Sequence, residues 1–376
     1  MRLFLRAGVV IGLATLAACG KDAPTPVDFT DPAAVSANLS AVDSALDSDI
    51  FRSYGIATGM LDIATAPAPA MRPVASLLET TRPELRRSGA NIFLPNVRQA
   101  QRLQAALPKL SVSAAQGRII PDSMYGRVFE WDATLHQYSY QGTTVTGLTG
   151  VRFILYAVGL DGAVVEPVSA IGSLDIIDQS TPSQLKLHVL VQGPGGTKTY
   201  LDYLATVVSS NTSATATASG FITNGLDGAA GKTLSFDEAL SVTRTGAHVT
   251  ATFALDNPAT TLMMNETASF NDPNIVLDAD FKLIQNGETI RTVGHVTVNT
   301  VTAVTNINVA VSLNGHPVAS INGDPSEPGT EWVDAGGEPL TIQDLAALDH
   351  LFDAWQSFQE AVTGLLAPIS TFGGSI

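Results

Sequence analysis

The chain of 376 residues has one cysteine, Cys19, and only 15% charged residues. One cysteine cannot form an internal disulfide, and it cannot supply the several thiolates of a typical structural zinc site. The six histidines are never three or four residues apart, so the usual metal-site spacing is missing as well. Basic residues are scarce: 20 Lys and Arg against 35 Asp and Glu give a net charge of −15, which repels nucleic-acid phosphates. We therefore expect no cofactor, no metal site and no nucleic-acid partner.

Sequence motifs of catalysis are also scarce. Neither a Gly-x-Ser-x-Gly elbow nor a His-Glu-x-x-His motif occurs. The stretch GLDGAAGKT (225–233) ends like a phosphate-binding loop, but that motif needs glycine where Leu226 stands, and a helix after it. An alternating segment, LSFDEALSVT, follows instead and favours a hairpin loop. We therefore expect that the protein is not an enzyme. Enzymatic activity ranks third, after the two hypotheses given at the end of this subsection.

The amino-terminal segment has the pattern of an export signal. MRLFLR supplies two arginines, and an apolar run from Ala7 to Ala18 follows, too short to span a bilayer. The run ends in Leu16-Ala17-Ala18-Cys19, which resembles the lipobox of bacterial lipoproteins. The resemblance implies cleavage before Cys19 and acylation of its thiol, and several acyl chains anchor a protein stably. The alternative is an ordinary buried cysteine. Gly20, in place of the aspartate that commonly retains lipoproteins in the inner membrane, favours the outer membrane, with the leaflet left open.

Helical patterns follow this segment. The prediction divides the start of the chain into a signal peptide (1–18), a lipidated tether (19–30) containing Pro24 and Pro26, and a helical segment (31–120). Apolar residues recur at helical spacing over 32–48, and further helices are predicted near 73–87 and 96–107.

From residue 121 to 323 the apolar period changes to two, which is typical of antiparallel strands with one buried face. HVTATFALDN, NIVLDADFKLI and TVTAVTNINVAVSLNG alternate most clearly, and the last of these is expected to place Val301 on the buried face. Turn signals such as Asn286-Gly287 and Asn314-Gly315 separate the runs. We predict an antiparallel meander of about eleven or twelve strands between Arg127 and Ile321.

An acidic loop (324–340) and a carboxy-terminal segment (341–376) complete the predicted order. Thr341 is a candidate N-cap of a long amphipathic helix over 342–366. The loop is either solvated or a calcium site, although it lacks a calcium-binding loop spacing. The fold class is α+β, mainly β, and a sheet this wide is expected to curl or split. A half-barrel with the final helix on its apolar face is favoured over a sandwich.

Two carboxylates fall on otherwise apolar strand faces. Glu238 shares its face with Phe236 and Leu240, and Glu266 shares its face with Met264. The pattern indicates either a shift of register at a bulge or a partly hydrated inner face. If that face binds an apolar ligand, the candidate binding residues are Phe253, Phe281, Phe352, Trp355, Glu238 and Glu266.

The stretches PDSMYGRVFEWD (121–132) and GVRFILYAV (150–158) resemble a set of uncharacterised bacterial lipoproteins with an alanine-rich helical start and a threonine- and valine-rich β body. That resemblance implies no activity. The expected architecture is similar to the LolA and LolB lipoprotein carriers and to mycobacterial lipid-binding lipoproteins, but fold does not imply function. Two hypotheses follow: a membrane-anchored carrier of an apolar ligand or lipid, or a structural or protein-interaction lipoprotein with a fully packed core.

Overall fold

The computed structural model describes residues 48–59 and 118–348, except positions 160, 211, 258, 286, 303, 325, 326, 328, 343 and 347. One α-helix, α2 (Asp49–Gly59), precedes the strands, and three short 3-10 helices are η3 (Asp122–Met124), η4 (Pro194–Gly196) and η5 (Gly228–Ala230). The strands are β1 (Arg127–Asp132), β2 (Gln137–Thr144), β3 (Gly150–Tyr156), β4 (Ala170–Asp178), β5 (Leu185–Gln192), β6 (Thr199–Ser209), β7 (Ser213–Thr223), β8 (Thr233–Thr243), β9 (Gly246–Asp256), β10 (Ala259–Asn271), β11 (Asn274–Gln285), β12 (Glu288–Asn299), β13 (Thr305–Leu313), β14 (His316–Gly323) and β15 (Val333–Asp334).

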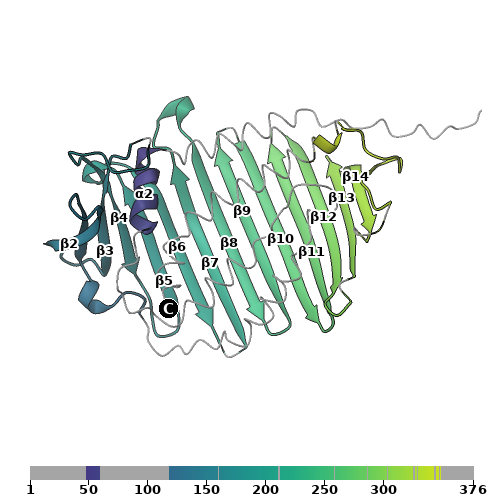
Figure 1. The fold of residues 1–376 in the computed structure, drawn as a ribbon, viewed down its shortest axis with the longest axis horizontal. Helices are drawn as coiled ribbons and strands as arrows, with labels where there is room; N and C mark the ends of the chain where they lie inside the picture. Colours follow the sequence, from purple (N-terminus) through teal and green to yellow (C-terminus); the bar gives the residue numbers. More distant parts are fainter. Residues whose placement is uncertain are drawn as a thin grey trace, which may run out of the picture.

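All these strands belong to one open sheet of 15 strands (Figure 1). From β3 to β15 each strand pairs antiparallel with the next, so this part is a continuous meander. The end of the sheet differs from the prediction, because β1 lies between β2 and β3 and pairs parallel with β3. The mainly β, antiparallel class is confirmed, and unbroken pairing joins the strands into one sheet instead of the two sheets of a sandwich.

The strand pattern is a consequence of two-residue alternation. In β11, Ile275, Leu277 and Ala279 are buried while Asp278 between them is exposed. The same alternation runs through β9 and β13, so the sheet has an apolar face, called the inner face below, and a polar outer face. Burying one Leu or Ile side chain stabilises the fold by roughly 1.5–3 kcal/mol, which is why a slip of one residue is strongly disfavoured.

Two details of the strand prediction are wrong. Between Arg127 and Ile321 the described residues form fourteen strands, β1–β14, not eleven or twelve; β2 is mostly exposed without alternation, and the two-residue β15 lies beyond this range. Val301 is 79% exposed in the turn between β12 and β13, so it does not continue the buried face. Helix α2 begins where the predicted helix 32–48 was expected to end. The expected helices over 32–48, 73–87 and 96–107 lie outside the described residues, apart from residue 48.

Helix α2 packs on the inner face near one end of the sheet, over β3 and β4 (Figure 1). The backbone N–H of Tyr156 donates to Ser53 Oγ of the helix at 2.9 Å, and both groups are buried. Tyr54 is hydrogen-bonded to Tyr203 of β6, and burial is the main cause of the raised pKa of Tyr54. Because a buried polar group without a partner is costly, these contacts fix where the helix lies on the sheet.

Gly220 of β7 allows two large rings to meet on the inner face. Its register partners are Tyr203 on β6 and Phe236 on β8, whose ring centroids are 5.9 Å apart. A Cβ atom at Gly220 would lie 2.5 Å from Tyr203 Cβ and 2.1 Å from the carbonyl oxygen of Asp202. The glycine therefore leaves space that the neighbouring aromatic rings use.

Side-chain oxygens accept hydrogen bonds from the backbone in the chain before β1 and in the chain after β14. Asp178 Oδ2 of β4 accepts hydrogen bonds from the backbone N–H groups of Ile119 and Ile120 at 2.6 and 2.8 Å. Thr341 has the predicted capping geometry, because its Oγ1 accepts from Asp344 N at 3.2 Å. The rest of the predicted carboxy-terminal helix, beyond Leu348, lies outside the described residues. None of the helices in the described ranges is long and apolar enough to cross a membrane.

Candidate functional site

Four of the predicted ligand-binding residues lie on the inner face of neighbouring strands. Phe253 of β9 and Phe281 of β11 are buried, 5% and 6% exposed, and Glu238 of β8 and Glu266 of β10 are partly buried. The register connects them: Glu238 lies opposite Ala251, and Met264, next on the inner face to Glu266, lies opposite Phe281. Phe352 and Trp355, the other two candidates, and Cys19 lie outside the described residues.

Glu238 is surrounded by small and apolar positions. Its partners across the sheet are Ala218 on β7 and Ala251 on β9. Burial raises the pKa of Glu238 to about 7, with a smaller contribution from the like charge of Asp237. The strand pairing is regular around it, so the alternative of a bulge at this position is wrong.

Glu266 has an equivalent environment on β10, where its partners are Val249 and Ala279. Desolvation by burial raises its pKa to about 7, and the pairing on both sides is regular. Within the described parts of β8–β13, no lysine or arginine alternates onto the inner face, and neither carboxylate hydrogen-bonds to a described residue. Desolvation therefore favours the neutral form of each carboxyl group, and no described cation favours the charged form, so each is about half protonated at pH 7.

A third polar group lies at the end of the same face. Gln285 is 7% exposed on β11, and its Nε2 has no hydrogen-bond partner among the described residues. An unpaired buried donor of this kind costs about 1–3 kcal/mol. The inner face of β8–β11 thus combines a large apolar surface with a few polar groups whose hydrogen-bonding capacity is not used, which is the composition of a typical small-molecule site.

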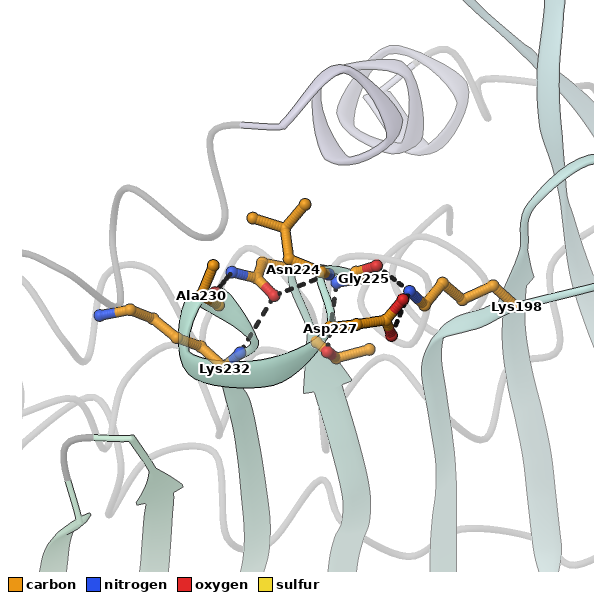
Figure 2. Close-up of polar contacts among 8 residues, drawn as sticks. Lys198, Asn224, Gly225, Asp227, Ala230 and Lys232 are labelled. Atoms are coloured by element: carbon orange, nitrogen blue, oxygen red, sulfur yellow. Dashed lines mark hydrogen bonds and ion pairs between the residues drawn. The ribbon is translucent and has the colours of Figure 1, made fainter.

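Hydrogen bonds within the loop between β7 and β8, and one from Lys198, fix its conformation (Figure 2). Asn224 Oδ1 accepts from the backbone N–H groups of Leu226 and Lys232 at 3.1 and 3.0 Å, and Lys198 Nζ donates to the carbonyl oxygen of Gly225. The Lys232 side chain points away from the loop. Strand β8 begins directly at Thr233, so no helix follows the glycine-rich stretch. The predicted hairpin loop is confirmed.

The five histidines among the described residues are dispersed over the sheet. His188 Nε2 lies 2.7 Å from Asp202 Oδ1, and His136 lies beside Glu166. In the described part of the chain, no three His, Cys, Asp or Glu side chains form a group that could hold a metal ion. In the acidic loop, Asp334 Oδ1 accepts from the backbone N–H groups of residues 336 and 338 at 2.7 and 3.0 Å, which is a turn-forming role.

The outer face of the sheet carries a polar row across β9–β12. His295 Nδ1 of β12 lies 2.7 Å from Asp278 Oδ1 of β11, and its Nε2 lies 3.4 Å from Thr297 Oγ1. His248 Nδ1 of β9 bonds to Thr267 Oγ1 of β10 at 3.0 Å in the same row. The signal that could have found the first group is the Asn286-Gly287 turn, because a two-residue hairpin places residue 278 opposite residue 295.

No protein-family model matches the chain, and neither a curated protein nor a solved structure shows detectable similarity to it.

Proposed function

We propose that this protein is an exported lipoprotein that is anchored to the cell envelope through Cys19 and binds an apolar ligand on the inner face of its sheet. The outer membrane is the proposed address, because of the residue after Cys19. The activity is binding and carrying, with no reaction on the ligand.

The observation that carries the binding proposal is the pair Glu238 and Glu266. Two carboxyl groups without a described cationic partner on an apolar face are a cost that a core built only for stability would avoid. A ligand with an apolar body and a polar group would offset this cost by hydrogen bonding to them. The unpaired Nε2 of Gln285 adds a donor on the same face.

The alternative proposal is a structural or protein-interaction lipoprotein with a filled interior. It is favoured by the low exposure of the large inner-face side chains: Phe253, Phe281 and Leu283 are at most 6% exposed. In this alternative the loops and the outer face would make the contacts with partners, and no small molecule would be bound.

Native mass spectrometry of the soluble full chain carrying Cys19→Ser, purified after incubation with a lipid extract of envelope membranes, distinguishes the two proposals. The binding proposal predicts that an apolar molecule copurifies with the protein. Glu238→Gln and Glu266→Gln together should change the bound fraction, whereas Asp237→Asn, which alters the outer face of the same strand, should leave it unchanged. Recovery of only the bare polypeptide from all variants would contradict the binding proposal and favour the alternative.

The anchor has a separate test. In cells supplied with radiolabelled palmitate, the chain should incorporate label and sediment with membranes, and Cys19→Ser should abolish the labelling. Equal labelling of both chains would show that Cys19 is not the acylation site.

A further inference from the structure

Three residues on the outer face of the sheet are arranged as nucleophile, base and orienting carboxylate. Asp278 Oδ1 lies 2.7 Å from His295 Nδ1, which fixes the proton of the imidazole on Nδ1. The other ring nitrogen, Nε2, is then an acceptor, and Thr297 Oγ1 lies 3.4 Å from it. This is the connectivity of an Asp-His-hydroxyl triad, and nucleophile-base distances in ligand-free sites are often longer than 3.2 Å.

The sheet register explains why the three groups meet. The β11–β12 hairpin places Asp278 directly opposite His295. Thr297 follows His295 by two residues on β12, so both side chains point to the same face. Both regular strands are held by inner-face burial, and the arrangement is therefore not that of a loose loop.

The neighbouring strand β13 supplies a hydrogen-bond donor that could stabilise the oxyanion formed during acyl transfer. Asn306 of β13 is the register partner of Thr297, and its side chain is exposed. Directly opposed residues in an antiparallel pair have Cβ atoms about 4.5–5.5 Å apart, so the Asn306 amide reaches the space beside Thr297 Oγ1. A side-chain amide is an effective oxyanion donor in acyl transfer.

We propose that Asp278, His295, Thr297 and Asn306 form an acyl-transfer site for carboxylic esters on the outer face. Thr297 Oγ attacks the ester carbonyl carbon while His295 Nε2 takes the hydroxyl proton. The ester C–O bond then breaks, and the leaving alcohol takes that proton from Nε2. Water then attacks the acyl carbon while His295 Nε2 takes one of its protons. The bond to Thr297 Oγ breaks, the proton returns to Oγ, and the carboxylic acid is released.

In this site Thr297 and His295 are the catalytic residues, and Asp278 is a positioning residue. The side chains of His295 and Asp278 are 55% and 60% exposed, so the site is open to solvent. A site open to solvent admits esters that are part of large molecules. Water is not excluded from it, however, and electrostatic stabilisation is weaker there than in an enclosed site. We therefore expect a rate effect at or below the low end of general-base catalysis, about 100-fold or less.

The test uses the full chain with Cys19→Ser, which removes the only thiol, and p-nitrophenyl acetate as the probe. Thr297→Val and His295→Gln should lower the turnover by about 10-fold or more, and a trapped acetyl group should map to Thr297. Asn306→Ala should lower the rate with unchanged substrate KM. Asp278→Asn should lower kcat without changing KM or the circular dichroism spectrum.

The outer face also offers a matched control. His248 and Thr267 are bonded through Nδ1 at 3.0 Å on the same face, so that imidazole is held by a hydroxyl and not by a carboxylate. His248→Gln should leave the turnover unchanged. The proposal is overturned if Thr297→Val releases p-nitrophenolate at the rate of the Cys19→Ser chain, or if the acetyl group is found only on lysines.

Discussion

Replacing Glu266 with glutamine tests whether the buried carboxyl group lowers the free energy of unfolding when it is ionised. The pKa of Glu266 is raised by burial from the ordinary 4.5 to about 7. The folded protein therefore holds a proton that the unfolded chain releases between these values. Glutamine has nearly the same shape as the protonated carboxyl group but cannot lose a proton, so the substitution removes this linkage and little else.

The sign of the effect follows from proton binding in the two states. Because the folded state binds more protons between pH 4.5 and 7, the free energy of unfolding falls as the pH rises through this window. The full shift corresponds to about 3 kcal/mol, and the partial exposure of the side chain reduces this to roughly 1–3 kcal/mol. Glu266→Gln should be as stable as the native chain at pH 4 and more stable by that amount at pH 8.

Urea unfolding followed by circular dichroism at pH 4, 6 and 8 measures the difference. Glu238→Gln should behave alike, because its pKa is also raised to about 7. Asp237→Asn, which removes a carboxylate from the exposed side of β8, is the control and should keep most of the pH dependence of the native chain, losing only its small contribution to the raised pKa of Glu238. If Glu266→Gln shows the same fall in stability from pH 4 to pH 8 as the native chain, the assignment of this dependence to the buried carboxyl group is refuted.

Other substitutions test the packing by thermal or urea unfolding. Gly220→Ala should destabilise the fold by about 1–3 kcal/mol, because its Cβ would overlap Tyr203. Asp178→Ala should cost about 2 kcal/mol or more, since two buried N–H groups lose their acceptor. Gln285→Leu should increase stability by about 1 kcal/mol, because it removes an unpaired buried donor. Val301→Ser should change stability by less than about 0.5 kcal/mol, and a large loss there would contradict its exposed position.

The strands with strict alternation could be predicted from the sequence because the alternation of apolar and polar residues lies within each strand and does not depend on its neighbours. Ile275, Leu277 and Phe281 fall on one face whatever their neighbours are, and all are buried. Val301 breaks the rule because the alternation of its segment continues through a turn. Local periodicity does not show where pairing stops; the partner strand β13, which begins at Thr305, decides that.

The candidate residues on the inner face were predictable as members of that face, but their environment was not. The positions of Glu238 and Glu266 among apolar residues are visible in the sequence, and the structure confirms that both lie in regular pairing. Their raised pKa values depend on burial by residues that are distant in the chain. The beginning of the carboxy-terminal helix was predicted from Thr341, whereas α2 was not predicted as a separate helix.

The sequence by itself determined the two-faced strands, their order in a meander and the tight turns, because these features depend on the spacing of residues within a few positions. It also contains the pairing of Asp278 with His295, since a two-residue turn fixes the register of its hairpin. Only the tertiary structure decided that Asn306 lies beside Thr297 and that β1 inserts between β2 and β3. Longer connections leave several registers open, and the packing of side chains across the whole sheet selects one of them.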